Sequence, residues 1–316
     1  MVHPRTLQGA MLLTAVLLPF GTSAQSRGTA RPLFSAEAVP LQGIAPVAKD
    51  GHRGRGYLRK PREGARFPAV LIIHPGNREL PDASLKDYVL NSPVPSAFLA
   101  AGYVIAVTTY RSRDIDPQAT AATEDTVAAL ELLRALPYVD PKSVVAYGCS
   151  NGGDLALEAA RVTEVAAIAA EEPATPMFTG VFNKNSPKAG ERFTPRDAFA
   201  IMETPLRFYT AEYQRLTQEK LRSLNTPILL VQGDGIVARF NNEVFIPELE
   251  RGRKTVTHKT YAGEPHCFMF GPIGSVQVTT PRPAVAQQAF RDVDLFFRQH
   301  LRTQPTPMMI DFAWPR

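Results

Sequence analysis

The sequence predicts an α/β fold, namely one doubly wound, mostly parallel sheet with helices on both faces and a cap insertion. Two observations carry this prediction. From about residue 65 onward, short apolar runs alternate with longer amphipathic stretches, which is the order of strands joined by crossover helices. The central runs are nearly continuous in Val, Ile, Leu and Ala, as strands are when helices cover both faces of a parallel sheet.

Length and composition fit one large domain. The chain has 316 residues, of which 44% are hydrophobic, enough for a sizeable core, and no linker-like change of composition divides it. We therefore expect the α/β domain to occupy residues 53–316. A loosely ordered leader is expected over residues 25–52.

The first 24 residues have the pattern of a cleavable signal peptide. Arg5 provides a basic start, residues 10–20 form an apolar run, and the small residues 21–24 suit cleavage after Ala24. The apolar run is too short to span a bilayer as an anchor. We expect a secreted or periplasmic protein without stable membrane insertion after cleavage.

The net charge of +5 does not indicate a nucleic-acid partner. Basic residues are scattered, and their densest group lacks interleaved aromatic residues, so we interpret it as a solvated strand. That group consists of Arg53, Arg55, Arg59, Lys60 and Arg62. No Cys/His spacing typical of a metal site is present.

The expected elements follow one another in regular order. Strands are expected at residues 68–74, 103–109, 143–147, 165–169, 227–232 and 255–261, with an antiparallel edge strand at 54–58. Helices are expected at residues 84–101, 118–136, 152–162, 241–251 and 283–301. In the second of these helices, Leu130 and Leu133 lie on one apolar stripe while Glu131 faces water.

One interval departs from this order. From residue 173 to 225 no strand is expected, and helical segments occur around 195–202 and 205–224. An insertion after the C-terminal end of a strand lies where such sheets bind ligands, so we interpret residues 174–225 as a cap over the site. The alternative is a surface excursion that only packs on the scaffold.

The segment Gly148-Cys149-Ser150-Asn151-Gly152 lies between an apolar run and a helical stretch. Strand, Gly-x-Ser-x-Gly, helix is the arrangement that lifts a serine hydroxyl onto a tight turn. Side chains at the two glycine positions would collide with neighbouring backbone. The helix that follows points its N-terminal N–H groups toward Ser150, where negative charge would develop. We expect Ser150 to be a nucleophile.

A serine nucleophile needs a general base, which is nearly always a histidine held by an acid. Of the six histidines, His266 lies in a turn-rich loop after the last expected strand, where a side chain can reach across the top of the sheet. Its position after the serine matches the chain order Ser…acid…His. We expect His266 to be the base.

Three segments around these residues resemble α/β-hydrolases, in particular the dienelactone-hydrolase-like and prolyl-oligopeptidase-like groups. They read V-A-Y-G-C-S-N-G-G at 145–153, P-I-L-L-V-Q-G-D at 227–234 and Y-A-G-E-P-H-C-F at 261–268. The resemblance extends from about residue 68 to 301. It implies the α/β-hydrolase fold with Ser150 as nucleophile and His266 as base. This chemistry calls for no metal and no organic cofactor.

Dienelactone hydrolases use a cysteine nucleophile, which makes Cys149 an alternative. With Cys149 at the turn apex, Tyr147 and Asn151 would occupy the crowded flanking positions, so we favour Ser150. Cys149 and Cys267 each adjoin an expected catalytic residue. A disulfide between them and two buried thiols both remain open at this stage.

The acid of the triad is the least defined group. The resembled families usually carry it three residues beyond the glycine that follows the 227–232 strand, but this position is Ile236. We predict Asp234, as though the loop were shortened. Glu171 and Glu172 are alternatives, because some relatives carry the acid on the neighbouring strand, and Glu243 is a weaker one.

The oxyanion hole requires two N–H donors. The N–H of Asn151, directly after the nucleophile, is the expected first donor. The loop at residues 74–77 resembles the His-Gly-Gly loops of esterases, with Pro75 replacing one glycine. Because proline has no N–H, we expect Gly76 or Asn77 to be the second donor. His74 and, after the next strand, Arg111 are expected to have structural roles.

The combined prediction is an exported serine hydrolase that cleaves a carboxylic ester by acyl transfer to water. Its substrate would be a small-molecule ester. A small peptidase acting on short peptides by the same chemistry is the first alternative. The alternative from another class is a hydrolase-fold protein that binds a ligand without turning it over.

Overall fold

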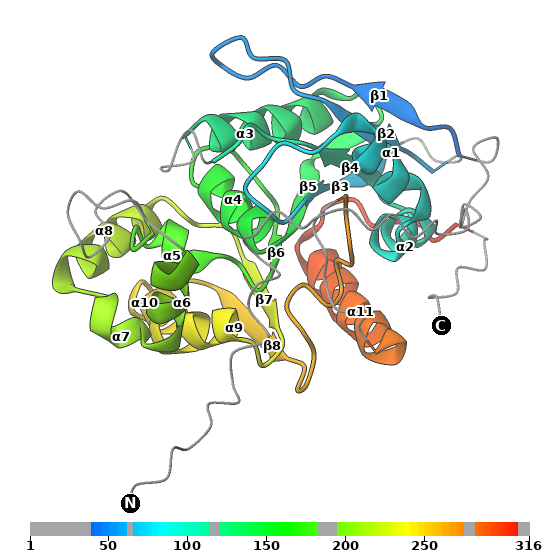
Figure 1. Cartoon of the computed structure of the whole chain (residues 1–316). Coiled ribbons are helices and arrows are strands. Elements are labelled where there is room, and N and C mark those ends of the chain that lie inside the picture. Colours follow the sequence, from blue (N-terminus) through cyan, green and yellow to red (C-terminus); the bar gives the residue numbers. More distant parts are fainter. Residues whose placement is uncertain (1–38, 62–65, 114–119, 183–194, 275–281, 309–316) are drawn as a thin grey trace, which may run out of the picture.

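The computed structural model describes residues 39–61, 66–113, 120–182, 195–274 and 282–308 (Figure 1). Within these residues, eight strands form one sheet in the order β1-β2-β4-β3-β5-β6-β7-β8. They are β1 (Gln42–Ile44), β2 (Gly56–Arg59), β3 (Phe67–Ile73), β4 (Val104–Thr108), β5 (Val139–Cys149), β6 (Ile168–Glu171), β7 (Ile228–Gln232) and β8 (Val256–Thr260). Strands β3 to β8 run parallel, whereas β1 and β2 are antiparallel to their neighbours.

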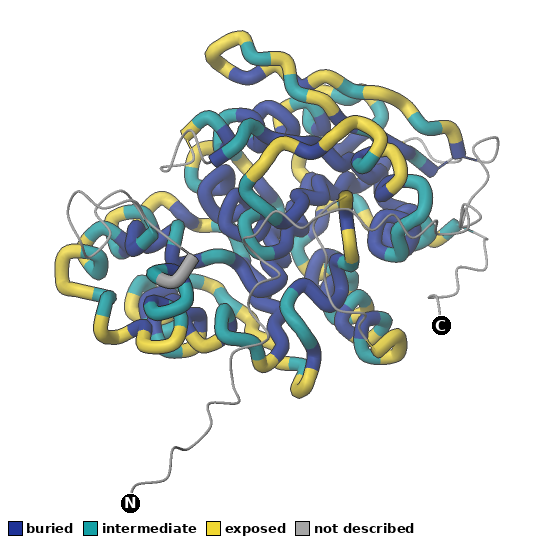
Figure 2. Tube along the Cα trace, viewed as in Figure 1, coloured by how far each residue is buried: buried dark blue, intermediate teal, exposed yellow. Residues whose placement is uncertain are grey.

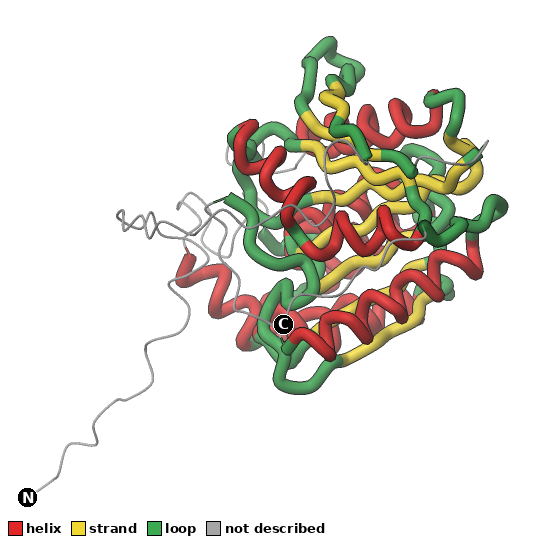
Figure 3. The backbone as a smooth tube through the Cα atoms, turned by 90° about the vertical axis from the view of Figure 1, so that its right-hand side faces the viewer, coloured by secondary structure: helices red, strands yellow, loops and turns green. Residues whose placement is uncertain are grey.

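Helices cover both faces of the sheet, as Figure 3 shows. On one face lie α1 (Asp82–Asn91), α2 (Pro93–Ala101) and α11 (Pro283–His300). On the other lie α3 (Thr120–Ala135), α4 (Asn151–Ala160), α8 (Ala211–Arg222) and α10 (Ile246–Arg251). The predicted doubly wound sheet is confirmed.

Alternation along the strands divides the core into two layers. In β3, Val70 and Ile72 pack toward α2 and α11, whereas Leu71 packs toward α3 and α4. Successive side chains of a strand point to opposite faces, so a strand covered on both faces is apolar throughout. All seven residues of β3 are buried, and Figure 2 shows the central strands as the buried interior.

The structure adds two features that the sequence analysis missed. The helix expected over residues 84–101 is two helices, because Ser92 precedes Pro93 and adopts an extended conformation (φ −86°, ψ 147°). Proline disfavours helical backbone at the preceding residue. Strand β1 lies within residues 25–52, which were expected to be loosely ordered, and it takes the sheet edge that was expected for β2. Residues 1–24 lie outside the described residues.

The insertion after β6 is helical where it is described. It contains α5 (Thr175–Phe178), α6 (Pro195–Glu203), α7 (Pro205–Phe208) and α8, followed by β7. Ile201 of α6 packs with Phe240 and Val244, which belong to α9 (Ile236–Phe240) and the π-helix η1 (Asn241–Phe245). Among the described residues, no helix is both long and apolar enough to cross a membrane.

Candidate active site

Ser150 lies in a strained turn between β5 and α4, as the sequence predicts. Its backbone has φ 53° and ψ −119°, a conformation that L-residues rarely adopt. The turn is held by hydrogen bonds from the Ser150 N–H to the carbonyl of Glu171 (3.0 Å) and from the N–H groups of Asp154 (3.1 Å) and Ala174 (2.9 Å) to the Ser150 carbonyl. Strain that the surroundings hold in place is typical of functional sites.

Both flanking glycines are required by close backbone contacts. A Cβ atom on Gly152 would lie 2.1 Å from the carbonyl oxygen of Ile73, and one on Gly148 would lie 2.4 Å from the backbone of Gly152. The turn therefore packs directly on the end of β3. This close approach is the physical reason for the Gly-x-Ser-x-Gly pattern.

His266 is paired with Glu172, which follows β6 directly. Nδ1 of His266 lies 2.7 Å from Oε2 of Glu172, and the same oxygen accepts the N–H of Cys267 at 2.9 Å. Oε1 accepts the N–H of Gly233 at 3.1 Å. Glu172 is fully buried, whereas the His266 side chain is 27% exposed. Glu172 therefore orients a histidine that remains accessible from solvent.

The structure pairs His266 with Glu172, one of the alternatives, and places the carboxylate of the predicted acid Asp234 on the backbone of Gly263. The Asp234 carboxylate accepts the N–H of Gly263 at 2.6 Å and so stabilises the loop that leads to His266. Nδ1 of His266 carries at most one hydrogen, and its hydrogen-bond acceptor is the Glu172 carboxylate. Glu243 forms a surface pair with Arg239 at 2.7 Å. The sequence signal for Glu172 was its place at the end of an apolar strand beside the serine strand.

The environment makes His266 a stronger base than a free imidazole. Burial by itself lowers the pKa of His266, but the charge and hydrogen bond of Glu172, together with the charge of Glu171, outweigh it. The net result is a pKa above the ordinary value of 6.5. An opposite charge within a few ångströms stabilises the imidazolium, which is the form that a general base reaches after taking a proton.

A disulfide joins the nucleophile turn to the histidine loop. Cys149 and Cys267 are bonded, with 5.8 Å between their Cα atoms and 118 positions between them in sequence. A ring nitrogen of His266 lies within 4.8 Å of both sulfur atoms. The bond settles the question left open by the sequence and excludes Cys149 as a nucleophile in this state. The three residues do not form a metal site, because metals bind the thiolate form of cysteine.

The disulfide brings Ser150 and His266 into one neighbourhood at the carboxyl ends of β5 and β8. Among the described residues, no hydrogen bond joins the Ser150 hydroxyl to the His266 ring. In enzymes without substrate such bonds are often long and tighten only when substrate binds. Ser150, Glu172 and His266 therefore lie in one region of the structure, in this chain order, with Glu172 directly after β6.

The loop after β3 lies beside the nucleophile turn. Gly76 has φ 90°, in the region that favours glycine, and its carbonyl accepts the hydroxyl of Tyr110. The His74 ring stacks on Tyr110 at 4.2 Å, and its Nδ1 donates to the carbonyl of Pro75 at 2.8 Å. Burial lowers the pKa of His74 to about 4, so the ring is neutral and supports the loop.

Arg113, which the sequence analysis did not single out, connects the two expected oxyanion donors. Its backbone N–H donates to the carbonyl of Asn77 at 2.9 Å, and its guanidinium donates to Oδ1 of Asn151 at 3.0 Å. The same guanidinium forms a buried ion pair with Asp154 at 2.9 Å. Burial raises the pKa of Asp154 to about 6 although Arg113 opposes this shift.

Arg111 has the structural role that its position suggested. Its Nε lies 3.1 Å from both carboxylate oxygens of Asp125 on α3, and its guanidinium pairs with Asp50. It therefore joins the N-terminal segment to α3 and contacts neither Asn77 nor Asn151 through any described hydrogen bond.

Known structures share this architecture. A Pyrobaculum calidifontis esterase matches with a TM-score of 0.57 and 20% identity, over 81% of this chain and 84% of that chain. Carboxyl esterase 2 of Tuber melanosporum matches with a TM-score of 0.59 and 18% identity, over 88% of this chain and 90% of that chain. The protein has the α/β-hydrolase fold.

Two sequence comparisons cover smaller parts of this chain. Residues 57–188 match the model of BD-FAE, an α/β-hydrolase family, and this span includes Ser150 and Glu172 but ends before His266. A stretch of 114 residues is 31% identical to a tRNA dimethylallyltransferase of Synechocystis sp.. That stretch covers 35% of this chain and 38% of the relative, so the chain spans well under half of that protein.

Proposed function

We propose that this protein is a serine hydrolase that cleaves carboxylic esters, with Ser150 as nucleophile, His266 as base and Glu172 as orienting acid. The single observation that carries the proposal is the hydrogen bond between Nδ1 of His266 and Glu172. The loop that contains His266 is joined by a disulfide to Cys149, the residue before Ser150. The esterases that share the fold support ester bonds as the target.

The mechanism follows from the roles of these groups. Nε2 of His266 takes the Ser150 proton as the hydroxyl oxygen attacks the carbonyl carbon, while Glu172 stabilises the imidazolium. The N–H of Asn151 and one from Gly76 or Asn77 hold the oxyanion. His266 then gives its proton to the leaving alcohol. A water molecule, deprotonated by His266, then attacks the acyl carbon. The bond from this carbon to the Ser150 oxygen breaks, and His266 returns the proton to that oxygen as the carboxylic acid leaves.

A peptidase acting on short peptides remains the alternative within the same chemistry. A panel of p-nitrophenyl esters of rising acyl length, run beside aminoacyl p-nitroanilides, separates the two. We expect kcat/KM to be highest on one of the esters. Cleavage of the anilides in preference to every ester would replace the esterase by the peptidase.

A non-catalytic binding protein is the alternative from another class. We expect a fluorophosphonate probe to label the intact protein on one residue and to leave Ser150→Ala unlabelled. Mass spectrometry of the digested adduct locates the modified residue. Absence of labelling and of ester hydrolysis in the folded wild-type protein would favour the binding protein.

We also propose export with removal of residues 1–24. The disulfide supports this proposal, because such bonds persist in oxidising compartments. Expression of the full chain in a bacterial host, followed by fractionation and N-terminal sequencing, tests it. We expect a mature chain that begins near Gln25 outside the cytoplasm, whereas an uncut cytoplasmic chain would contradict export.

A further inference from the structure

A second buried glutamate, Glu171, lies beside the proposed triad and has no part in the mechanism given above. It is the last residue of β6 and is fully buried. One carboxylate oxygen accepts the N–H of Met269 at 2.7 Å. The other accepts the N–H of Phe270 at 3.0 Å and the hydroxyl of Tyr147.

Two consecutive glutamates thus hold one continuous loop. Glu172 binds the ring of His266 and the N–H of the next residue. Glu171 binds the N–H groups of Met269 and Phe270, three and four residues after His266. Hydrogen bonds from N–H groups to a carboxylate are stronger than those to a neutral acceptor. The position of His266 therefore depends on charge at both residues.

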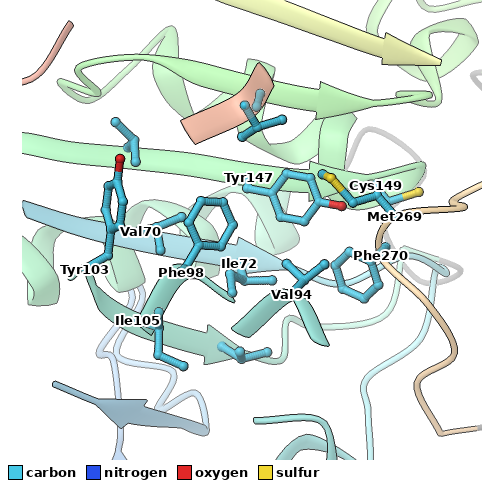
Figure 4. Packing of buried hydrophobic residues seen from close by; sticks show 14 of the residues in the cluster. Val70, Ile72, Val94, Phe98, Tyr103, Ile105, Tyr147, Cys149, Met269 and Phe270 are labelled. Atoms are coloured by element: carbon cyan, nitrogen blue, oxygen red, sulfur yellow. The ribbon is translucent and has the colours of Figure 1, made fainter. Parts of the chain in front are cut away.

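The surroundings of Glu171 are aromatic and closed. The Phe270 ring stacks on Tyr88 at 4.8 Å and on Tyr147 at 5.9 Å, and the Tyr88 hydroxyl donates to the Phe270 carbonyl at 2.9 Å. Figure 4 shows Tyr147 and Phe270 beside Met269 and Cys149 in this cluster. Burial is the main cause that raises the pKa of both tyrosines, so their hydroxyls stay protonated and can donate.

The charge of Glu171 is set by a small number of neighbours. Burial raises its pKa to about 7, while the Tyr147 hydroxyl, the Met269 N–H and the charge of His266 lower it, and the charge of Glu172 raises it. Glu171 in turn contributes to the raised pKa of His266. The titratable groups that act on this carboxylate among the described residues include Tyr147, His266 and Glu172, together with the phenol of Tyr88.

We propose that Glu171 is a positioning residue for His266. The negative charge of Glu171 fixes the loop after the histidine and stabilises the imidazolium formed during catalysis. The inference rests on the proposed serine-hydrolase function. Glu171 touches neither the substrate nor the reacting atoms and acts only through His266. It makes the site dependent on two adjacent carboxylates instead of one.

The first test compares Glu171→Gln with the wild type. Glutamine has nearly the same shape but carries no charge and cannot accept both backbone N–H groups with its two ends. We expect kcat on a p-nitrophenyl ester to fall about 10-fold with KM within about 3-fold, because a slightly misplaced base affects the chemical step more than binding. The loss should persist at pH 9.

Tyr147→Phe is the matched variant, because it removes one hydroxyl and keeps the ring that packs against Phe98 and Phe270. It removes one donor to the carboxylate, which raises the pKa of Glu171 and leaves it protonated at neutral pH. We expect the ratio of its kcat to that of the wild type at the same pH to be reduced at pH 7 and close to one at pH 9, where Glu171 is ionised again. An equal loss at both pH values would indicate a packing defect and overturn the proposal.

An NMR titration measures the pKa of His266 directly, so it tests the inference without any measurement of turnover. The imidazole signal is assigned by its loss in His266→Ala and followed in the wild type and Glu171→Gln. We expect a lower His266 pKa in the variant, and an unmoved pKa overturns the inference even if esters are hydrolysed. A lowered pKa in a protein that hydrolyses no ester overturns the proposed function alone.

Discussion

Glu172 and His266 meet although 94 positions separate them in sequence, with 2.7 Å between the carboxylate and Nδ1. Glu172 adopts φ 41° and Cys267 adopts φ 58°, and both residues share a positive φ with Ser150. Arg253 is the fourth described residue other than glycine that has a positive φ. Backbone strain is thus concentrated where the carboxylate, the ring and the hydroxyl are presented, which favours a site held in one geometry.

This relationship predicts unequal effects for the two candidate acids. Glu172→Gln should lower kcat by about 10³-fold or more, since the imidazolium loses its charged partner and the ring loses its fixed tautomer. Asp234→Asn should keep kcat/KM within about 3-fold, because Asp234 only supports Gly263. Steady-state kinetics on one p-nitrophenyl ester measures both variants. A larger loss in Asp234→Asn would restore Asp234 as the acid.

The pKa of His266 predicts the acid limb of the pH profile. In the proposed mechanism the base works as neutral imidazole. Because the pKa of His266 is raised above 6.5, the ring becomes protonated at a higher pH than a free imidazole does when the pH is lowered. We expect kcat/KM of the wild type to decline as the pH falls through this raised value. In Glu172→Gln the limb should move to lower pH, because the neutral side chain no longer stabilises the imidazolium. A limb that stays in place would contradict the role of Glu172.

The sequence predicts the turn at Ser150 correctly because this turn is specified locally. Gly148 and Gly152 are needed for contacts within the turn and with the neighbouring strand, and an apolar strand and a helix flank them. The acid depends on distant parts of the chain. Which carboxylate reaches His266 is decided by the pairing of β6 with β7 and by the lengths of two loops, and none of these leaves a local pattern.

The same distinction explains the differences in the fold. Apolar runs predict β3 to β7 because burial on both faces requires continuous apolar sequence. Strand β1 has only three residues, none of them buried, so it leaves no hydrophobic pattern. The break at Ser92 and Pro93 could have been recognised from the sequence, since the residue before a proline tends to leave the helical region.

The disulfide predicts a large contribution to stability. Replacing both residues in Cys149→Ala/Cys267→Ala should lower the free energy of unfolding by about 2–5 kcal/mol, because the bond closes a long loop in the unfolded chain. Urea unfolding of both proteins without reductant measures the difference. Thiol titration of the unfolded wild type should find no free thiol, and two thiols would contradict the bond.

The contacts of the buried Arg113 predict that it contributes to oxyanion stabilisation. The binding of a transition-state analogue measures this contribution separately from substrate binding. Arg113→Lys keeps a positive charge for Asp154 but loses the fork that also reaches Asn151. We expect kcat to fall by about 10-fold or more with KM within about 3-fold, because Arg113 positions the expected oxyanion donors and these act mainly in the transition state. A trifluoromethyl ketone analogue should bind more weakly in proportion to the loss in kcat/KM.

Arg111→Lys is the control for Arg113→Lys, since the two arginines lie two residues apart and both join loops. Arg111 pairs with Asp50 and Asp125 away from the oxyanion loop, so its replacement should affect stability while kcat/KM stays within about 3-fold. Thermal unfolding of both variants separates folding from catalysis. If Arg113→Lys and Arg111→Lys lose activity equally, or if the analogue binds Arg113→Lys as tightly as the wild type, Arg113 only holds the fold together.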